Sequence, residues 1–339
     1  MIEKIVDWSA KNKIFVFFGV AFMTVWALWS IKNIPLDAIP DLSDTQVIVY
    51  AKWDRPPQVI EDQVTYPIVS ALLGAPKVKD IRAFSDYGFS YIYLIFEDGT
   101  DIYWARSRVM EYLSKVTQQL PKEANIELGP DATGVGWVYQ YALVDESGKL
   151  SLEELRGFQD WHLKYALQSV KGVSEVASIG GFVKQYQVVV DPNALQQYKI
   201  PLSSVVNAVR GANLETGARV LELSGTEYML TVKGYAAKIS DIEQAVLRVS
   251  NGVPVTIKNV AKVETGPEIR RGLAELNGDG EAVGGIVVMR HGENALNTIK
   301  AVKEKISSVQ LPEGVKLVAV YDRSELINRA VETLKKKLI

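Results

Sequence analysis

A run of uncharged residues, Ile14–Ile31, is the feature that most constrains this chain of 339 residues. As an α-helix the run would be about 27 Å long, close to the thickness of the hydrocarbon core of a bilayer. Trp26 and Trp29 lie toward one end, where aromatic residues gather at membrane interfaces. We therefore expect a transmembrane helix over 14–32, preceded by a cytoplasmic or interfacial segment over 1–13.

Lysines set the expected orientation of this helix. Lys4, Lys11 and Lys13 precede the run, whereas aspartates follow it. Because positive charge stays on the cytoplasmic side, we expect a cytoplasmic N-terminus and the long remainder outside. A cleaved signal peptide is the main alternative, but its apolar core should be shorter and a small-x-small cleavage site should follow. The segment Asn33–Asp37, which follows instead, lacks such a site.

Composition excludes several classes of site. The chain has no Cys and two His, which excludes disulfides, thiol catalysis and a three-histidine zinc centre. The 38 Lys and Arg nearly balance the 40 Asp and Glu, and no basic stripe indicates nucleic-acid binding. Motifs for nucleotide, serine-hydrolase or zinc-protease chemistry are missing, and the five Met are scattered. We expect no enzyme activity, no cofactor, no nucleic-acid partner and no metal site within the chain.

Patterns after the anchor predict a β-α-β-β-α-β unit, the ferredoxin-like split unit. The predicted strands are 45–53, 79–84, 90–96 and 124–128, and the predicted helices are 57–72 and from Asp101 to about Gln119.

This unit recurs later in the chain. A fixed shift of 95 residues places Val78 on Val173 and Tyr91 on Tyr186, and a second echo aligns Phe96–Gly99 with Met289–Gly292. Chance alignment of hydrophobic strands is the alternative.

The second copy is predicted to be interrupted. Its strand 136–144, helix 151–169 and strand 173–180 continue in strand 283–290, helix 294–307 and strand 315–321. The intervening insert holds strand-like stretches 184–190 and 227–233, helical stretches 202–211 and 239–247, and a long loop, Ala212–Ser224, that suits an extended arm.

Two polar positions stand out from these patterns. Arg82 lies within a strand-like run, and Asp131 follows Gly129-Pro130 in a glycine-rich crossover between the two copies. Clefts form at such junctions, so both are candidates for a cleft wall, with a surface rim charge as the alternative for each.

Several motifs resemble the start of resistance-nodulation-division efflux pumps of the heavy-metal branch. They are Pro35-Leu36-Asp37-Ala38-Ile39-Pro40-Asp41-Leu42-Ser43-Asp44, Glu61-Asp62-Gln63-Val64-Thr65-Tyr66-Pro67, Phe96-Glu97-Asp98-Gly99-Thr100-Asp101 and Leu128-Gly129-Pro130-Asp131-Ala132-Thr133-Gly134. Within that branch, Tyr103-Trp104-Ala105-Arg106-Ser107-Arg108 and Gly134-Val135-Gly136-Trp137 are similar to the copper/silver pumps. Divalent-cation relatives commonly carry an acidic residue at the place of Trp137, and an apolar ring there suits a softer ion.

The resemblance implies an α+β fold with one N-terminal transmembrane helix followed by two ferredoxin-like β-α-β-β-α-β porter subdomains, the second split by an inserted docking subdomain. The expected first porter subdomain is 33–134, the second is 135–181 with 272–330, the docking insert is 182–271, and 331–339 would begin a second transmembrane region.

The resemblance also implies a proton-driven homotrimer in the bacterial inner membrane, with 33–330 in the periplasm. It would export a metal ion through a periplasmic adaptor protein and an outer-membrane channel. Arg82, Asp131 and Trp137 would line the substrate cleft. The docking arm that reaches a neighbouring subunit would include Asn213, Glu215, Arg219 and Glu222.

One departure concerns length. Members of this family are much longer and have many membrane helices, whereas this chain has one such run. The proton-relay residues and metal-binding methionines of the family would lie beyond Ile339, so we interpret the chain as an N-terminal fragment that could not pump alone. Two alternatives stay open: a divalent-cation or drug exporter of the same superfamily, and a single-pass periplasmic interaction module without transport.

Overall fold

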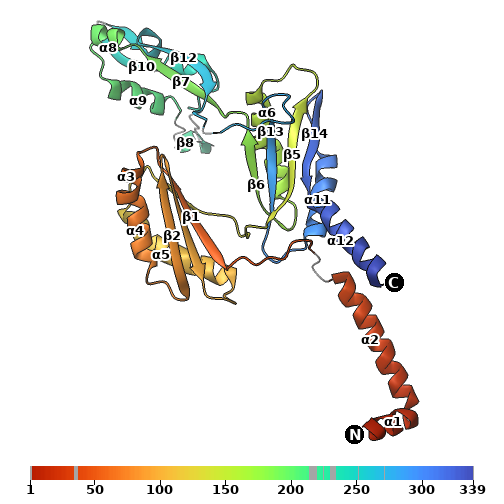
Figure 1. Ribbon diagram of the computed structural model, residues 1–339. Helices are drawn as coiled ribbons and strands as arrows, with labels where there is room; N and C mark the ends of the chain where they lie inside the picture. The colour runs from red at the N-terminus through yellow and green to blue at the C-terminus, as the bar shows by residue number, and fades with distance from the viewer. Residues whose placement is uncertain are drawn as a thin grey trace. The chain divides into compact units, whose positions relative to one another are not determined.

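The computed structural model describes residues 2–33, 37–213, 220–223, 225–229, 234–250, 252–270 and 272–338 (Figure 1). Contacts divide the chain into two compact units. The first comprises 1–150, 158–179 and 282–339, and the second comprises 151–157 and 180–281. Each is described by itself.

Two helices open the chain, α1 (Ile2–Lys11) and α2 (Lys13–Asn33). Within α2, Lys13–Ser30 has a mean hydropathy of 1.7 and none of it is buried in the protein. Apolar side chains therefore surround this helix on all sides, as in a helix that contacts lipid. By length and composition α2 is a candidate membrane span, and it contains the predicted helix 14–32.

A ferredoxin-like β-α-β-β-α-β repeat follows, as predicted (Figure 1). Its sheet has the strand order β2-β3-β1-β4, and both neighbours of β1 run antiparallel to it. The elements are β1 (Gln46–Lys52), α3 (Pro57–Ile60), η1 (Glu61–Thr65), α4 (Tyr66–Leu72), β2 (Val78–Asp86), β3 (Phe89–Phe96), α5 (Ile102–Val116), η2 (Thr117–Gln119) and β4 (Asn125–Leu128).

One hydrophobic core joins the helices of this repeat to its sheet. Strand β1 alternates between buried and half-buried residues, which directs Val47, Val49 and Ala51 toward the helices. Ile68 of α4 and Val109 of α5 are fully buried against them. The Asp101 side chain accepts a hydrogen bond from the Trp104 amide and so caps α5, at the predicted position.

The first helix of this repeat has an unusual middle. Residues of η1 form a π-helical turn, which is wider than an α-helical turn. This turn places Thr65 beneath the helix, where its buried hydroxyl donates to the Ser90 hydroxyl of β3 at 2.8 Å.

A second repeat has the same topology, with the strand order β14-β5-β13-β6. Its elements are β5 (Trp137–Asp145), α6 (Leu152–Phe158), η3 (Gln159–Leu163), α7 (Lys164–Gln168), β6 (Val173–Gly180), β13 (Val283–Met289), α11 (Ala295–Ser308) and β14 (Val315–Asp322), and α12 (Arg323–Leu338) follows.

The fixed shift of 95 residues is correct only for the first half of the repeat. Val173 begins β6, the counterpart of β2, but Tyr186 lies on β7, which pairs with β12 in the other unit. The counterpart of β3 is β13, as the second echo predicts. The shift of 95 is wrong beyond β6 because the insert separates β6 from β13.

The second unit comprises residues 180–281 together with most of α6, and the predicted insert 182–271 lies inside it. Strand β7 pairs antiparallel with β12, β10 with β11, and β8 with β9. Its elements are β7 (Lys184–Val190), α8 (Pro192–Tyr198), α9 (Leu202–Gly211), β8 (Val220–Leu223), β9 (Thr226–Met229), α10 (Ile239–Glu243), β10 (Val246–Ser250), β11 (Val253–Thr256), η4 (Ile257–Asn259) and β12 (Ala261–Pro267).

Two predictions within this unit need correction or restriction. The predicted helix 239–247 is wrong at its end, because α10 stops at Glu243 and Val246 begins β10. Of the predicted strand 227–233, β9 covers the residues up to Met229, and 230–233 lie outside the described residues.

Candidate functional site: the crossover between the repeats

The crossover from β4 to β5, residues 129–136, is fixed at both ends by main-chain hydrogen bonds. The Gly129 amide donates to the Ile48 carbonyl of β1 at 2.8 Å, and the Met289 amide donates to the Gly136 carbonyl at 2.7 Å. A Cβ atom at Gly136 would lie 3.1 Å from the carbonyl oxygen of Met289, so glycine permits this close approach. The crossover is therefore held by strands of both repeats.

Asp131 is the polar centre of the crossover. Its Oδ1 accepts a hydrogen bond from the Ser174 hydroxyl of β6, and its Oδ2 accepts one from the Tyr103 hydroxyl of α5 at 3.2 Å. The Arg290 Nε, just after β13, forms an ion pair with Oδ2 at 2.8 Å. The His291 amide donates to the Asp131 carbonyl at 2.9 Å. One side chain thus connects the second helix of the first repeat to β6 of the second repeat and to the residue that follows β13.

These contacts keep Asp131 charged. Partial burial alone would raise the pKa of its carboxyl group. The Ser174 hydroxyl, the Arg290 guanidinium and the Tyr103 hydroxyl all stabilise the carboxylate, and the net result is a lowered pKa. Burial raises the pKa of Tyr103, and the same carboxylate raises it further, so the phenol stays protonated as a donor.

A groove of about 420 Å³ lies beside the crossover. One wall is the segment 37–41, which we call the strap because it follows α2 and precedes β1. Asp41 of the strap accepts a hydrogen bond from the Thr133 hydroxyl at 2.6 Å. Burial raises the pKa of Asp41, but its bonds from Thr133 and Ser43 outweigh that effect and lower it. The other walls are Val135, Gly136 and the loop 289–293.

The three predicted cleft residues lie in different surroundings. Asp131 is 15% exposed at the centre just described. Trp137 begins β5, directly after the crossover, and its side chain is 54% exposed. Arg82 lies on β2, 72% exposed, and forms an ion pair with Asp80 at 2.9 Å. Among the described residues, no hydrogen bond or ion pair joins Arg82 to either of the other two, so the assignment of a cleft to all three stays a prediction.

The predicted docking arm is described only in part. Asn213 follows α9, and its side-chain oxygen accepts a hydrogen bond from the Ala236 amide at 3.2 Å. Glu222 lies on β8, on an exposed side of the hairpin with β9. Glu215 and Arg219 lie outside the described residues.

Sequence reasoning missed the partners of Asp131. Ser174 carries no motif of its own, whereas Tyr103 begins the motif Tyr103–Arg108 and Arg290 lies in the second echo, so these two could have been noticed. Within the described part of the chain, no group of three or more His, Cys, Asp or Glu side chains is arranged to hold a metal ion. The site therefore consists of hydrogen bonds and ion pairs that fix chain segments to one another.

Comparisons with known proteins place this arrangement in a family. The sequence profile of the AcrB/AcrD/AcrF family matches residues 5–339, and the chain belongs to that family of resistance-nodulation-division transporters. The chain is 52% identical, over its full length, to the cation efflux system protein CusA of Escherichia coli (strain K12). It is 36% identical to the cobalt-zinc-cadmium resistance protein CzcA of Cupriavidus metallidurans, again over its full length.

Solved structures agree with these relatives. A crystal structure of a heavy metal efflux pump superimposes with a TM-score of 0.85 at 27% identity, and covers 96% of this chain. The chain spans about a third of the length of these proteins, namely 33% of CusA, 33% of CzcA and 33% of the crystallised pump. Its close relatives are therefore metal-cation exporters, of which it matches one part.

Proposed function

We propose that this chain is the N-terminal third of a proton-driven exporter of a soft monovalent metal ion, Cu(I) or Ag(I). The observation that carries the proposal is the 52% identity to a cation efflux protein over the full length of the chain. In this proposal α2 anchors the chain in the bacterial inner membrane with a cytoplasmic N-terminus. The two ferredoxin-like repeats form one wall of a periplasmic substrate cleft.

The geometry of the crossover supports a role in this cleft. A transporter of this kind must change the relation between its periplasmic parts while keeping them attached. Asp131 binds side chains from both repeats, so it provides such an attachment. Trp137 follows at the start of β5 with an exposed ring, which would present an apolar surface to the substrate. A poorly hydrated monovalent ion tolerates such a surface better than a divalent ion does.

We also propose the assembly that the family resemblance implies. Three copies would associate, and the insert 182–271 would dock with neighbouring subunits. A periplasmic adaptor protein and an outer-membrane channel would complete the export path. The exposed apolar residues of this insert, among them Val249 and Val253 of β10 and β11, support a surface that other chains cover.

A chimera tests the proposed substrate. Residues 1–339 would replace the aligned 343 residues of E. coli CusA, in a strain that lacks its own copy. We expect the chimera to restore growth in silver at concentrations that inhibit the parent strain. Failure to restore growth, although the chimera reaches the membrane in normal amount, would refute the proposal.

A divalent-cation exporter is the second candidate, and the 36% identity to CzcA supports it. The substitution Trp137→Glu in the chimera separates the two candidates. If the monovalent assignment is correct, the acidic side chain should reduce silver resistance and leave or raise zinc resistance. Unchanged resistance to both ions would remove the argument based on Trp137, and zinc resistance of the unsubstituted chimera would favour the second candidate.

A further inference from the structure

Arg323 is the largest fully buried side chain of the described residues, with 1% of its side chain exposed. It lies at the first position of α12, directly after β14. Its Nε is 2.9 Å from the Asp37 Oδ1, and its Nη1 donates to the Val135 carbonyl of the crossover. Its Nε, although paired in charge with Asp37, and its Nη2 are both buried without a hydrogen-bond partner among the described residues.

Such an arrangement is a poor way to stabilise a fold. Removing a guanidinium from water is expensive, and one ion pair with an unmatched Nη2 only partly offsets that cost. An apolar side chain of similar volume would serve a core at least as well. The buried ion pair therefore has another consequence, which is to specify which segments lie together.

The segments joined by Arg323 belong to different parts of the chain. Asp37 is the first described residue after α2, and the strap it begins leads along the chain to β1 of the first repeat. Arg323 belongs to the second repeat and its following helix. The Asp37 Oδ1 also accepts a hydrogen bond from the Ala38 amide at 2.6 Å, which holds the start of the strap in a turn. The strap is thus joined to the first repeat by the covalent chain and to the second repeat by the ion pair with Arg323. If the strap moves, both repeats are displaced.

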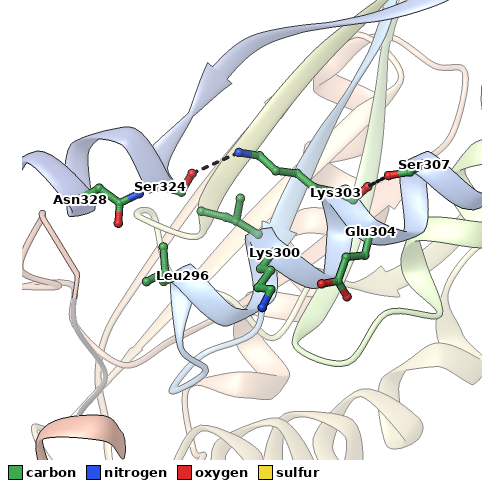
Figure 2. A pocket seen from close by; sticks show the side chains of 8 residues that line it. Leu296, Lys300, Lys303, Glu304, Ser307, Ser324 and Asn328 are labelled. Atoms are coloured by element: carbon green, nitrogen blue, oxygen red, sulfur yellow. Dashed lines mark hydrogen bonds between the residues drawn. The ribbon is translucent and has the colours of Figure 1, made fainter.

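Asp322, the residue before Arg323, attaches the start of α12 to α11. Asp322 forms an ion pair with Lys303 of α11 and accepts hydrogen bonds from the Ser324 amide and hydroxyl. Figure 2 shows Lys303 reaching across to Ser324 above the groove that separates α11 from α12. That groove has a volume of about 430 Å³ and is lined by Leu296, Lys300 and Asn328, among others. Beside the groove, helix α12 is attached to the repeat by polar contacts at its first turn.

We propose that Asp37, Arg323 and the Val135 carbonyl form a clamp that makes the strap and the start of α12 move as one body. Asp37 and Arg323 are positioning residues: they couple the segment after the candidate membrane helix to the second repeat. The clamp goes beyond the proposed function and does not depend on it. In an exporter it would transmit displacements of α2 to both repeats at once.

Distances between spin labels test the clamp in the whole chain, reconstituted in lipid nanodiscs. The chain has no Cys, so two introduced cysteines are the only labelling sites. Leu42, the residue directly after the strap, and Glu325 of α12 are exposed and suit this purpose. We expect a single narrow distance distribution, and at least a twofold broadening in Asp37→Asn and in Arg323→Met. The double variant should broaden no further, because each substitution already opens the clamp.

Two controls exclude a general loss of structure. Lys316→Met removes an exposed ion pair with Glu146 in the second repeat. It should leave the distance distribution between the labels at Leu42 and Glu325, the strap distribution, unchanged. A second label pair, at Lys149 and Lys300 within the second repeat, should keep its distribution in every variant. An unchanged strap distribution in Asp37→Asn, or equal broadening of both label pairs, would overturn the proposal. Silver resistance plays no part in this readout, so failure of the clamp and failure of the exporter assignment remain distinguishable.

Discussion

Replacing Asp131 with asparagine would leave the shape of the crossover nearly unchanged but remove the charge on which three side-chain donors converge. A hydrogen bond to a charged acceptor contributes about 1.5–3 kcal/mol to the stability of a folded protein, whereas a hydrogen bond between neutral groups contributes about 0.5–1.5 kcal/mol. Asparagine keeps one acceptor oxygen, so it can serve Ser174 or Tyr103 but presents its NH₂ group to the other. The Arg290 ion pair adds only about 0.2–1 kcal/mol, because Arg290 is 42% exposed.

Together these losses predict that Asp131→Asn lowers the free energy of unfolding of the first unit by about 2–3 kcal/mol. For a domain of this size, each kcal/mol lowers Tm by about 2–4 °C, so a decrease of about 4–12 °C is expected. The assay is thermal unfolding of the whole chain in nanodiscs at pH 7, followed by near-ultraviolet circular dichroism.

Asp80→Asn is the matched control for this prediction. It also removes one carboxylate from an arginine pair, but both partners are well exposed, so Tm should change by less than about 1 °C. If Asp131→Asn changes Tm as little as the control does, the carboxylate does not hold the two repeats together, and the interpretation of the crossover is wrong.

Three further predictions concern packing and charge. In Gly284→Ala the new Cβ would lie 2.1 Å from the Tyr141 carbonyl oxygen, so β13 must shift away from β5. We expect the free energy of unfolding, measured with urea, to fall by about 1–3 kcal/mol. Leu94→Ala leaves a cavity at a fully buried position in the first repeat. It should lower the free energy of unfolding by about 2–5 kcal/mol in the same assay, with no change in the stability of the second repeat. Burial raises the pKa of Asp322, but Lys303 and Ser324 outweigh that effect and lower the pKa. The ionised Asp322 therefore stabilises the fold fully at pH values above the ordinary pKa of 3.8, and this stabilisation is lost as the pH falls below that value. Thermal melts between pH 3 and pH 7 should show a smaller acid loss of stability in Asp322→Asn than in the unsubstituted chain.

Much of the fold could be predicted from the sequence because each repeat is built from regular, strongly patterned elements. The alternation of β1 and the helical spacing of α5 are local signals. The end of α10 was mispredicted for an equally physical reason. The apolar residues between Ile239 and Leu247 have a spacing that suits a helix, yet Val246 and Arg248 pair with β11. Tertiary pairing overrode local pattern there.

The candidate site was less accessible to sequence reasoning. Asp131 was noticed because it lies in a glycine-rich junction, but its partners Tyr103, Ser174 and Arg290 come from three elements far apart in the chain. Arg323 gave no signal at all, since an arginine at the start of a helix is ordinarily exposed. Its burial depends on the strap and the crossover meeting at that point, which only the three-dimensional arrangement reveals.

The two π-helical turns have a mechanical consequence for both repeats. The first helix of each repeat contains one, η1 (Glu61–Thr65) and η3 (Gln159–Leu163), and each buries a polar residue that bonds to its sheet, Thr65 to Ser90 and Gln159 to Tyr141. Each repeat therefore fixes its first helix to its sheet through a buried polar side chain, Thr65 at the end of η1 and Gln159 at the start of η3. Sliding of either helix along its sheet would break that bond in a buried place, where a lost partner is costly.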